Sequence, residues 1–140
     1  MLLHEILGIE YPIVQGAMAN IATAEFAAAV SNEGGLGIIG TGAMKPEQVR
    51  ESIEKCRTLT SNPFGVNVML MNPFSDEIFE VIYELKPKVV TTGAGNPGKY
   101  MAKLKELGIM IIPIIPTVAL ARRMEQAGAD MVIAEGTEAG

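Results

Sequence analysis

Residues 96–115, NPGKYMAKLKELGIMIIPII, decide the fold. The Asn-Pro pair that opens this stretch predicts the start of a helix, because proline suits the first helical turn. Tyr100 and Leu104 then recur at helical spacing, and Gly108 predicts the helix end. An unbroken apolar run follows over residues 109–115, which is typical of a strand that is covered on both faces. The stretch is therefore predicted to be one helix followed by one buried strand.

The same helix-strand unit recurs along the whole chain. Strands are predicted to begin near residues 13, 36, 64, 88, 109 and 131, at intervals of 21 to 28 residues. Helices are expected between them, capped or opened by Thr23, Pro46, Ser75, Asn96 and Thr117, with a short helical lead-in before residue 8. Strand, helix and strand at this period predict βαβ units and therefore a parallel sheet.

Two α/β architectures fit these units, an open doubly wound sheet and a TIM (β/α)8 barrel. The regular interval leaves no long crossover at which the strand order would reverse, and loops of small residues follow nearly every strand. A doubly wound sheet concentrates its ligand loops at one switch point, whereas a barrel spreads them around a ring. We therefore expect a member of the TIM-barrel class with about six of its eight βα units present, as one incomplete domain over residues 1–140.

Composition narrows the classes of function. The 140 residues are 49% apolar and carry a net charge of −5, which argues against nucleic acid and anionic membrane as partners. The N-terminus lacks a secretory signal pattern, and the longest apolar run, residues 107–121, is broken by glycine and proline, so a cytoplasmic protein is expected. Cys56 is the sole cysteine and is predicted to be a small core residue. His4, the sole histidine, is expected on the surface or on a lid.

Several common sites are absent or weak in the sequence. Residues 35–40 match the dinucleotide pattern G-x-G-x-x-G, but the match covers the strand itself, and the next predicted helix begins only at Pro46. We expect these glycines to serve turns and close strand packing instead. No Ser/His or Cys/His pair and no metal-ligand spacing occurs, so neither a catalytic triad nor a metal site is predicted.

The candidate site lies at the ends of four predicted strands, which carry polar or bare residues at 15–18, 67, 91–96 and 135–136. On a βα barrel such strand ends converge on one face. Glycine lets a flat ring approach the backbone closely, and the amide of Asn67 can bond the edge of a heterocycle such as a flavin pyrimidine. Each residue alone is typical of turns, and it is their recurrence that favours a binding face.

Five stretches closely resemble the nitronate monooxygenase (2-nitropropane dioxygenase-like) family. They are YPIVQGAM at 11–18, GGLGIIG at 34–40, PFGVN at 63–67, VVTTGAGNP at 89–97 and ADMVIAEGTEAG at 129–140. Within that family, the fourth and fifth stretches are most similar to the bacterial FMN-dependent enoyl-[acyl-carrier-protein] reductases. The resemblance runs in register over the whole chain.

The resemblance implies a TIM barrel with FMN at its C-terminal face and NADH or NADPH as the reductant, acting on an enoyl-acyl-carrier-protein substrate. Carried over by position, the residues that would contact FMN are Gly16, Ala17, Met18, Asn67, Gly93 and Glu135. Gly95 and Asn96 would border the substrate. Nitronate monooxygenases use the same flavin to oxidise nitronates with O₂, and this activity remains the alternative.

The resemblance also implies that the catalytic histidine of the family is not among these residues. In the family the Glu-Ala-Gly run continues into Gly-His, and that histidine is catalytic, whereas the sequence here ends at Gly140. We therefore expect an N-terminal part of an enzyme that is inactive by itself and that self-associates, or pairs as a homodimer, to cover open sheet edges. A non-catalytic half-barrel that binds a partner chain is the alternative from another class.

Overall fold

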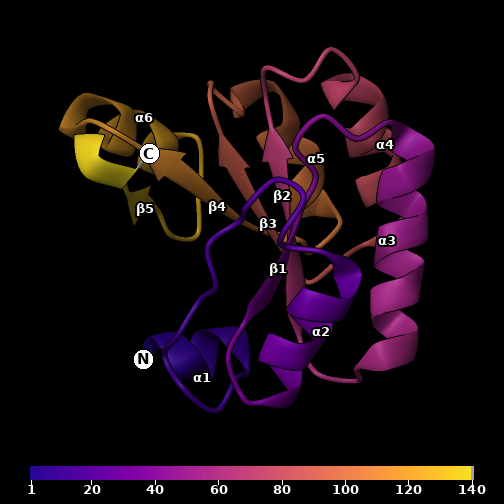
Figure 1. Ribbon diagram of the computed structural model, residues 1–140. Helices are drawn as coiled ribbons and strands as arrows, with labels where there is room; N and C mark the ends of the chain where they lie inside the picture. The colour runs from indigo at the N-terminus through magenta and orange to yellow at the C-terminus, as the bar shows by residue number, and fades with distance from the viewer. Residues whose placement is uncertain (140) are drawn as a thin grey trace.

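The computed structural model describes residues 1–139 and shows alternating helices and strands (Figure 1). The helices are α1 (Leu3–Leu7), α2 (Ala24–Asn32), α3 (Pro46–Leu59), α4 (Ser75–Leu85), α5 (Gly98–Glu106) and α6 (Val118–Gln126). The strands are β1 (Gly37–Gly40), β2 (Phe64–Met69), β3 (Val89–Gly93), β4 (Met110–Ile115) and β5 (Ile133–Ala134). A 3₁₀ turn, η1 (Thr137–Ala139), follows β5.

The five strands form one parallel sheet in the order β1-β2-β3-β4-β5. Each strand therefore pairs with the next one in sequence, and a helix fills every crossover. A doubly wound sheet would reverse its strand order at a switch point, and this sheet does not. The chain has the architecture of a TIM-barrel segment, as the sequence predicted, and α3 and α4 stand side by side along the outside of the sheet (Figure 1).

Local capping chemistry sets most helix ends where the sequence predicted them. Thr23 and Thr117 each accept a hydrogen bond at 3.2 Å from the backbone N–H three residues ahead, and Pro46 is the first residue of α3. The oxygen of Asn96 accepts a hydrogen bond at 2.8 Å from the N–H of Gly98, which begins α5.

The prediction that Ser75 caps α4 is wrong by one position. Ser75 is the first residue of the helix, and Phe74 occupies the cap position without a side-chain cap. Asn72 accepts hydrogen bonds at the start of the helix instead. Its side-chain Oδ1 accepts from the N–H of Phe74 at 2.8 Å, and its backbone carbonyl accepts from the N–H of Ser75 at 3.0 Å. An Asx turn thus opens α4.

Two predicted strands are shorter in the structure because side chains replace part of the backbone ladder. The strand expected from residue 13 is reduced to one parallel bridge between Val14 and Leu36. The amide of Gln15 continues the pairing, donating to Ile38 O at 3.1 Å and accepting from Ile38 N at 3.0 Å. The strand expected over residues 131–134 begins only at 133, and just before it the carboxylate of Asp130 accepts from the N–H of Ile111 at 3.0 Å.

The sheet is covered on both faces, which explains the unbroken apolar strands. On the outer face, Val66, Val90 and Ile111 pack against the helices, where the rings of Phe79 and Tyr100 stack with centroids 3.6 Å apart. On the inner face, the amino-end half holds a second buried cluster: Leu7 of α1 with Leu36, Ile38, Val89 and Ile112. The carboxyl-end half of the inner face is left for a site. No helix within residues 1–139 is long and apolar enough to cross a membrane.

Candidate functional site

A hollow of about 230 Å³ lies at the carboxyl ends of the strands, on the inner face of the sheet. All five strands or the loops next to them contribute to it, so it is the face on which parallel βα folds carry ligands. Apart from the carboxylate of Glu135, its lining residues are small, apolar or amide-bearing: Ala17, Ala19, Gly40, Gly42, Asn67, Met69, Gly93, Ala94 and Ile114.

The structure brings together four of the predicted cofactor residues, Ala17, Asn67, Gly93 and Glu135. They come from segments as far apart in sequence as the loop before α2 and the residue after β5. The convergence that the sequence predicted for these strand ends is therefore present. Their contact with a cofactor remains a prediction.

Asn67 is held in one orientation on the inner face. It stands opposite Thr91 in the register of β2 and β3, and its Nδ2 donates to the buried Thr91 Oγ1 at 2.9 Å. Its Oδ1 accepts no hydrogen bond from any residue in 1–139. A fixed amide with a free oxygen in a half-buried pocket is a ready acceptor for an N–H on a ligand.

Two of the predicted glycines keep open space that the protein itself does not fill. A Cβ at Gly93 would approach nothing closer than Ile114 Cδ1 at 3.8 Å, and a Cβ at Gly16 would meet nothing within 4 Å. Packing therefore does not require glycine at either position. A ligand that lies flat against the backbone would require it.

The glycines of the G-x-G-x-x-G match serve packing, as the sequence predicted. A Cβ at Gly37 would lie 1.8 Å from the carbonyl oxygen of Ala27, because α2 crosses directly over β1. A Cβ at Gly40 would lie 3.0 Å from the Met18 carbonyl oxygen. These contacts agree with discounting a dinucleotide fingerprint.

Four predicted site residues do not line the hollow. Gly16 and Met18 are the chain neighbours of Ala17 but are not among the lining residues, and Met18 is 39% exposed. Gly95 adopts φ +153°, and a Cβ there would lie 3.0 Å from Leu70, so backbone conformation and packing explain the glycine. Asn96 caps α5. The predicted substrate contacts of Gly95 and Asn96 gain no geometric support.

Sequence reasoning missed five lining residues, and two of them carried a usable signal; Ala94 lies within the predicted stretch 91–96. Met69 follows Asn67 by two positions, and Ile114 follows the inward Ile112 by two, so strand periodicity places both on the inner face. The remaining three, Ala19, Gly40 and Gly42, come from loops or a strand end whose path only the folded chain defines.

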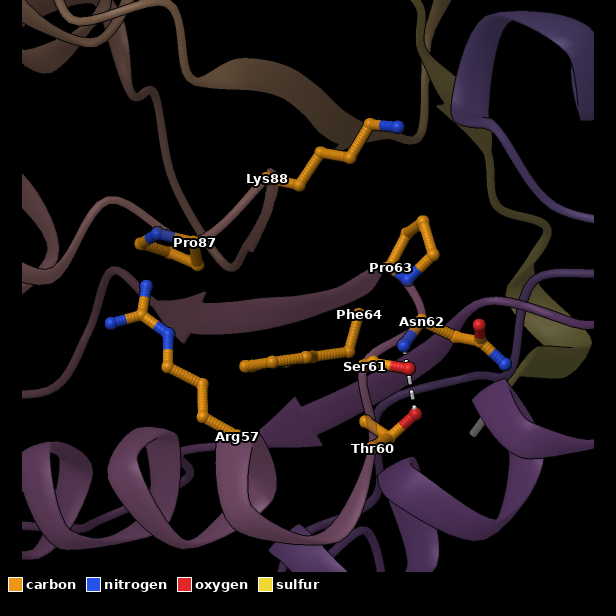
Figure 2. Close-up of a pocket in the computed structure, with 8 residues that line it drawn as sticks. All are labelled: Arg57, Thr60, Ser61, Asn62, Pro63, Phe64, Pro87 and Lys88. Carbon is orange, nitrogen blue, oxygen red and sulfur yellow. Dashed lines mark hydrogen bonds between the residues drawn. The ribbon is translucent and has the colours of Figure 1, made fainter.

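Another hollow, of about 390 Å³, lies at the opposite end of the sheet, near the amino ends of β2 and β3 (Figure 2). Helices α3 and α4 end there, with their partly negative C-termini. Figure 2 shows Arg57 extending beside Pro87, and its Nη2 donates to the carbonyls of Leu85 and Lys86 at the end of α4. Arg57 therefore satisfies carbonyl groups at the C-terminus of α4. We place the candidate site at the carboxyl ends instead.

The titratable groups outside the hollow suggest no second chemistry. Burial raises the pKa of the Cys56 thiol to about 11, which keeps the thiol protonated and unreactive. His4 lies in α1, which packs at the amino end of the sheet. Within residues 1–139, no cluster of three or more His, Cys, Asp or Glu side chains could hold a metal ion.

A protein-family model matches the whole chain. The model for the nitronate monooxygenase family aligns with residues 1–140. Among curated proteins, a (3aS,4S,5R,7aS)-5-hydroxy-7a-methyl-1-oxo-octahydro-1H-indene-4-carboxyl-CoA dehydrogenase of Mycobacterium tuberculosis is 33% identical over 99% of this chain and 39% of its own length. A nitronate monooxygenase of Paraburkholderia phytofirmans is 31% identical over 96% of this chain and 48% of its own.

The comparison with solved structures gives the same relationship. FabK from Thermotoga maritima superimposes with a TM-score of 0.95 and is 52% identical, over 97% of this chain and 44% of its own. A nitroalkane oxidase of Streptomyces ansochromogenes superimposes with a TM-score of 0.88 and is 29% identical, over 93% of this chain and 47% of its own. The chain thus spans less than half the length of each of these relatives.

Proposed function

This chain belongs to the nitronate monooxygenase family, and from that premise we propose that the whole protein is an FMN-dependent oxidoreductase that reduces the enoyl thioester of an acyl-carrier protein. The observation that carries the proposal is the similarity to FabK, an enoyl-ACP reductase, at 52% identity. The nitronate monooxygenase and the nitroalkane oxidase are 31% and 29% identical. The sequence run at residues 89–97 supports the same choice.

The residues of the hollow fit a flavin. The free Oδ1 of Asn67 would accept from the ring edge, and its Nδ2 bond to Thr91 keeps that oxygen oriented. Gly93 and Ala17 would present bare surface to the ring. Glu135, which directly follows β5, would line the hollow beside the ring. When bound, FMN would pass a hydride from NADH or NADPH to the β-carbon of the enoyl thioester.

The proton that completes the reduction needs a donor that the hollow does not provide. Glu135 is the only titratable residue among those that line it within the described chain, and it is exposed to water. We propose that the histidine of a Gly-His pair following Gly140 supplies the proton, as the Glu-Ala-Gly run implies by resemblance. Residues 1–140 would then bind and orient the flavin and the substrate, and a residue outside them would transfer the proton.

An assay of the whole protein tests the activity. We expect NADH or NADPH oxidation that depends on FMN and on a crotonyl thioester, and no activity from residues 1–140 alone. Turnover of the thioester by residues 1–140 would contradict the assignment of the proton donor.

Nitronate monooxygenase activity is the second candidate, favoured by the family model and by the Paraburkholderia relative. The same preparation is given propionate 3-nitronate and O₂ in place of the thioester and reductant. Oxygen uptake on the nitronate without thioester reduction would replace the reductase proposal with this one.

A further inference from the structure

Asn72 is a buried polar residue that does not line the candidate flavin hollow. It is 5% exposed and lies between β2 and α4. Its Nδ2 donates to Gly42 O at 3.0 Å and to Met44 O at 2.9 Å, while its Oδ1 accepts from Phe74 N at 2.8 Å. Because Oδ1 meets a donor and Nδ2 meets two acceptors, these contacts fix the orientation of the amide. The side chain thus joins the loops that follow β1 and β2.

The loop after β1, which Asn72 holds, forms part of the flavin hollow. Gly42 lines that hollow together with Ala19, and both also line an adjoining hollow of about 230 Å³, to which Ala43 contributes. The two loops are in close contact there, since a Cβ at Gly42 would lie 3.1 Å from Ala19 Cβ. The position of the loop after β1 therefore sets one side of the flavin hollow.

The turn in this loop does not fix its own central peptide. Met44 N donates to Thr41 O at 2.8 Å, which closes a four-residue turn. The backbone φ is +48° at Gly42 but is not positive at Ala43, which is the pattern of a type II′ turn. A type I′ turn has the same ends with the central peptide turned over. It requires a left-handed Ala43, at a cost similar to that of one buried hydrogen bond, so a contact from outside the turn can select between the two.

Asn72 supplies that outside contact. The Gly42 carbonyl that it holds belongs to the central peptide, and the Met44 carbonyl belongs to the last residue of the turn. Turning the central peptide over would move the Gly42 oxygen away from Nδ2 and leave one proton of a buried amide without an acceptor, which is costly. The β1–β2 pairing reaches only the first residue of the turn, where Thr41 N donates to Asn67 O at 3.3 Å. Asn72 thus holds the part of the loop that the sheet does not.

We propose that Asn72 is a positioning residue of the flavin site, which holds the peptide between Gly42 and Ala43 in one orientation at the hollow without touching the ligand. This role rests on the proposed flavin function, whereas the ordering of the loop does not. Without the two donors of Asn72 the loop samples both turns, and it must be ordered again each time a flavin binds. Flavin affinity then falls because preorganisation is lost, and not because a ligand contact is removed.

Asn72→Asp in the whole protein tests this role. Aspartate has the same size and keeps the acceptor for Phe74 N, but it loses both donors and places negative charge against two carbonyl groups. In the cofactor-free protein we expect the amide and Cα resonances of Ala43 to shift, or to broaden through exchange between the two turns. FMN affinity, measured by quenching of flavin fluorescence, should fall about tenfold, because two hydrogen bonds of a buried amide are lost.

Asn62→Asp is the matched control. Asn62 Nδ2 donates to Ser31 O at 3.0 Å, so the same substitution removes an amide donor from a backbone carbonyl, but at the amino end of the sheet. Both variants should lose stability, and only Asn72→Asp should lose FMN affinity. At saturating FMN, the visible circular dichroism of the bound flavin should change in Asn72→Asp and should match that of the unmodified protein in Asn62→Asp.

Asn72→Ser keeps the test decisive if a buried carboxylate prevents folding. Its hydroxyl can still accept from Phe74 N but is too short to reach both carbonyls, so we expect the same changes at smaller size. Unchanged Ala43 resonances, or FMN affinity equal to that of the unmodified protein, would overturn the role of Asn72 and leave the flavin proposal intact. Absence of FMN binding by the unmodified protein would overturn the flavin proposal and this role with it. The Ala43 resonances are recorded without flavin, so the two failures are distinguishable.

Discussion

At the scale of the residue, glycine has different roles at different positions of the sheet. Gly37 exists because the backbone of Ala27 lies where a side chain would be, and Gly65 because Ile38 does. Gly93 has no such neighbour. A glycine without a packing reason on the inner face is therefore the strongest residue-level indication that something else occupies that space.

Alanine substitutions separate these two kinds of glycine. Gly93→Ala should leave the free energy of unfolding unchanged or raise it by up to about 1 kcal/mol, because its Cβ has room and the unfolded chain loses entropy. It should also weaken FMN binding about tenfold, which is about 1.4 kcal/mol, because the added methyl group would occupy space that the flavin ring needs.

Gly65→Ala is the control on the same face. Its Cβ would lie 2.6 Å from Ile38 Cδ1 and 3.1 Å from Val89 O, so we expect a loss of about 1–3 kcal/mol in stability. Chemical denaturation and flavin titration of both variants give the comparison. Equal FMN affinity in Gly93→Ala and the unmodified protein would remove Gly93 from the proposed site.

At the scale of the element, the starts of α4 and α5 are tied together beside the site. Tyr100 donates to Asp76 Oδ1 at 2.5 Å, and Lys99 Nζ lies 2.7 Å from the same oxygen. The hydrogen bond from Lys99, followed by that from Tyr100, lowers the pKa of Asp76. Because the helices start where the strands end, this link fixes the loops that border the carboxyl-end face.

The lowered pKa of Asp76 predicts how this link depends on pH. The ionised form is stabilised by folding, so the contribution is complete above the unfolded value of 3.8 and is lost as the pH falls through the folded value. Asp76→Asn should therefore lower the melting temperature at pH 7, and the difference should close below pH 3.8. Because the pair is exposed, added salt should reduce the difference.

Glu77→Gln is the matched control for that measurement. Glu77 is the next residue, carries the same charge in the same helical turn, and forms no ion pair within residues 1–139. Melting curves between pH 7 and pH 2.5 are compared for the three proteins. If Asp76→Asn and Glu77→Gln behave alike, the helix dipole and not the link to α5 explains the effect.

At the scale of the whole molecule, the sheet is open at its ends. In the described chain β5 pairs only with β4. At the other edge β1 pairs with β2, and the only further pairing is the single bridge between Val14 and Leu36, the residue just before β1. Inner-face side chains near the open end, Met131 and Ile133, are half-buried, and Met69 is 39% exposed. Unpaired strand edges beside apolar surface promote association.

We therefore expect residues 1–140 to self-associate in solution. Light scattering after size exclusion should give a mass above 14.9 kDa that rises with concentration. The whole protein, in which further units would cover the open edges, should not show this dependence over the same range. A clean monomer of residues 1–140 at high concentration would contradict the expectation.

The sequence by itself determined the order and type of the elements. Thr23, Pro46, Asn96 and Thr117 mark helix starts because caps act within three residues along the chain, and glycines such as Gly108 end helices for the same local reason. Continuous apolar runs predicted buried parallel strands. The period predicted a barrel segment, and the unreversed strand order agrees with it.

Only the tertiary structure decided what those elements present to a ligand. Gln15 and Asp130 shorten two strands because their side chains reach backbone groups 23 and 19 residues away, and no local rule encodes such a contact. The contact of Asn72 with Gly42, 30 residues away, and the room beside Gly93 are likewise defined by atoms that are distant in sequence. Local hydrogen bonds fix where an element begins, whereas a site is made by what distant segments leave unfilled.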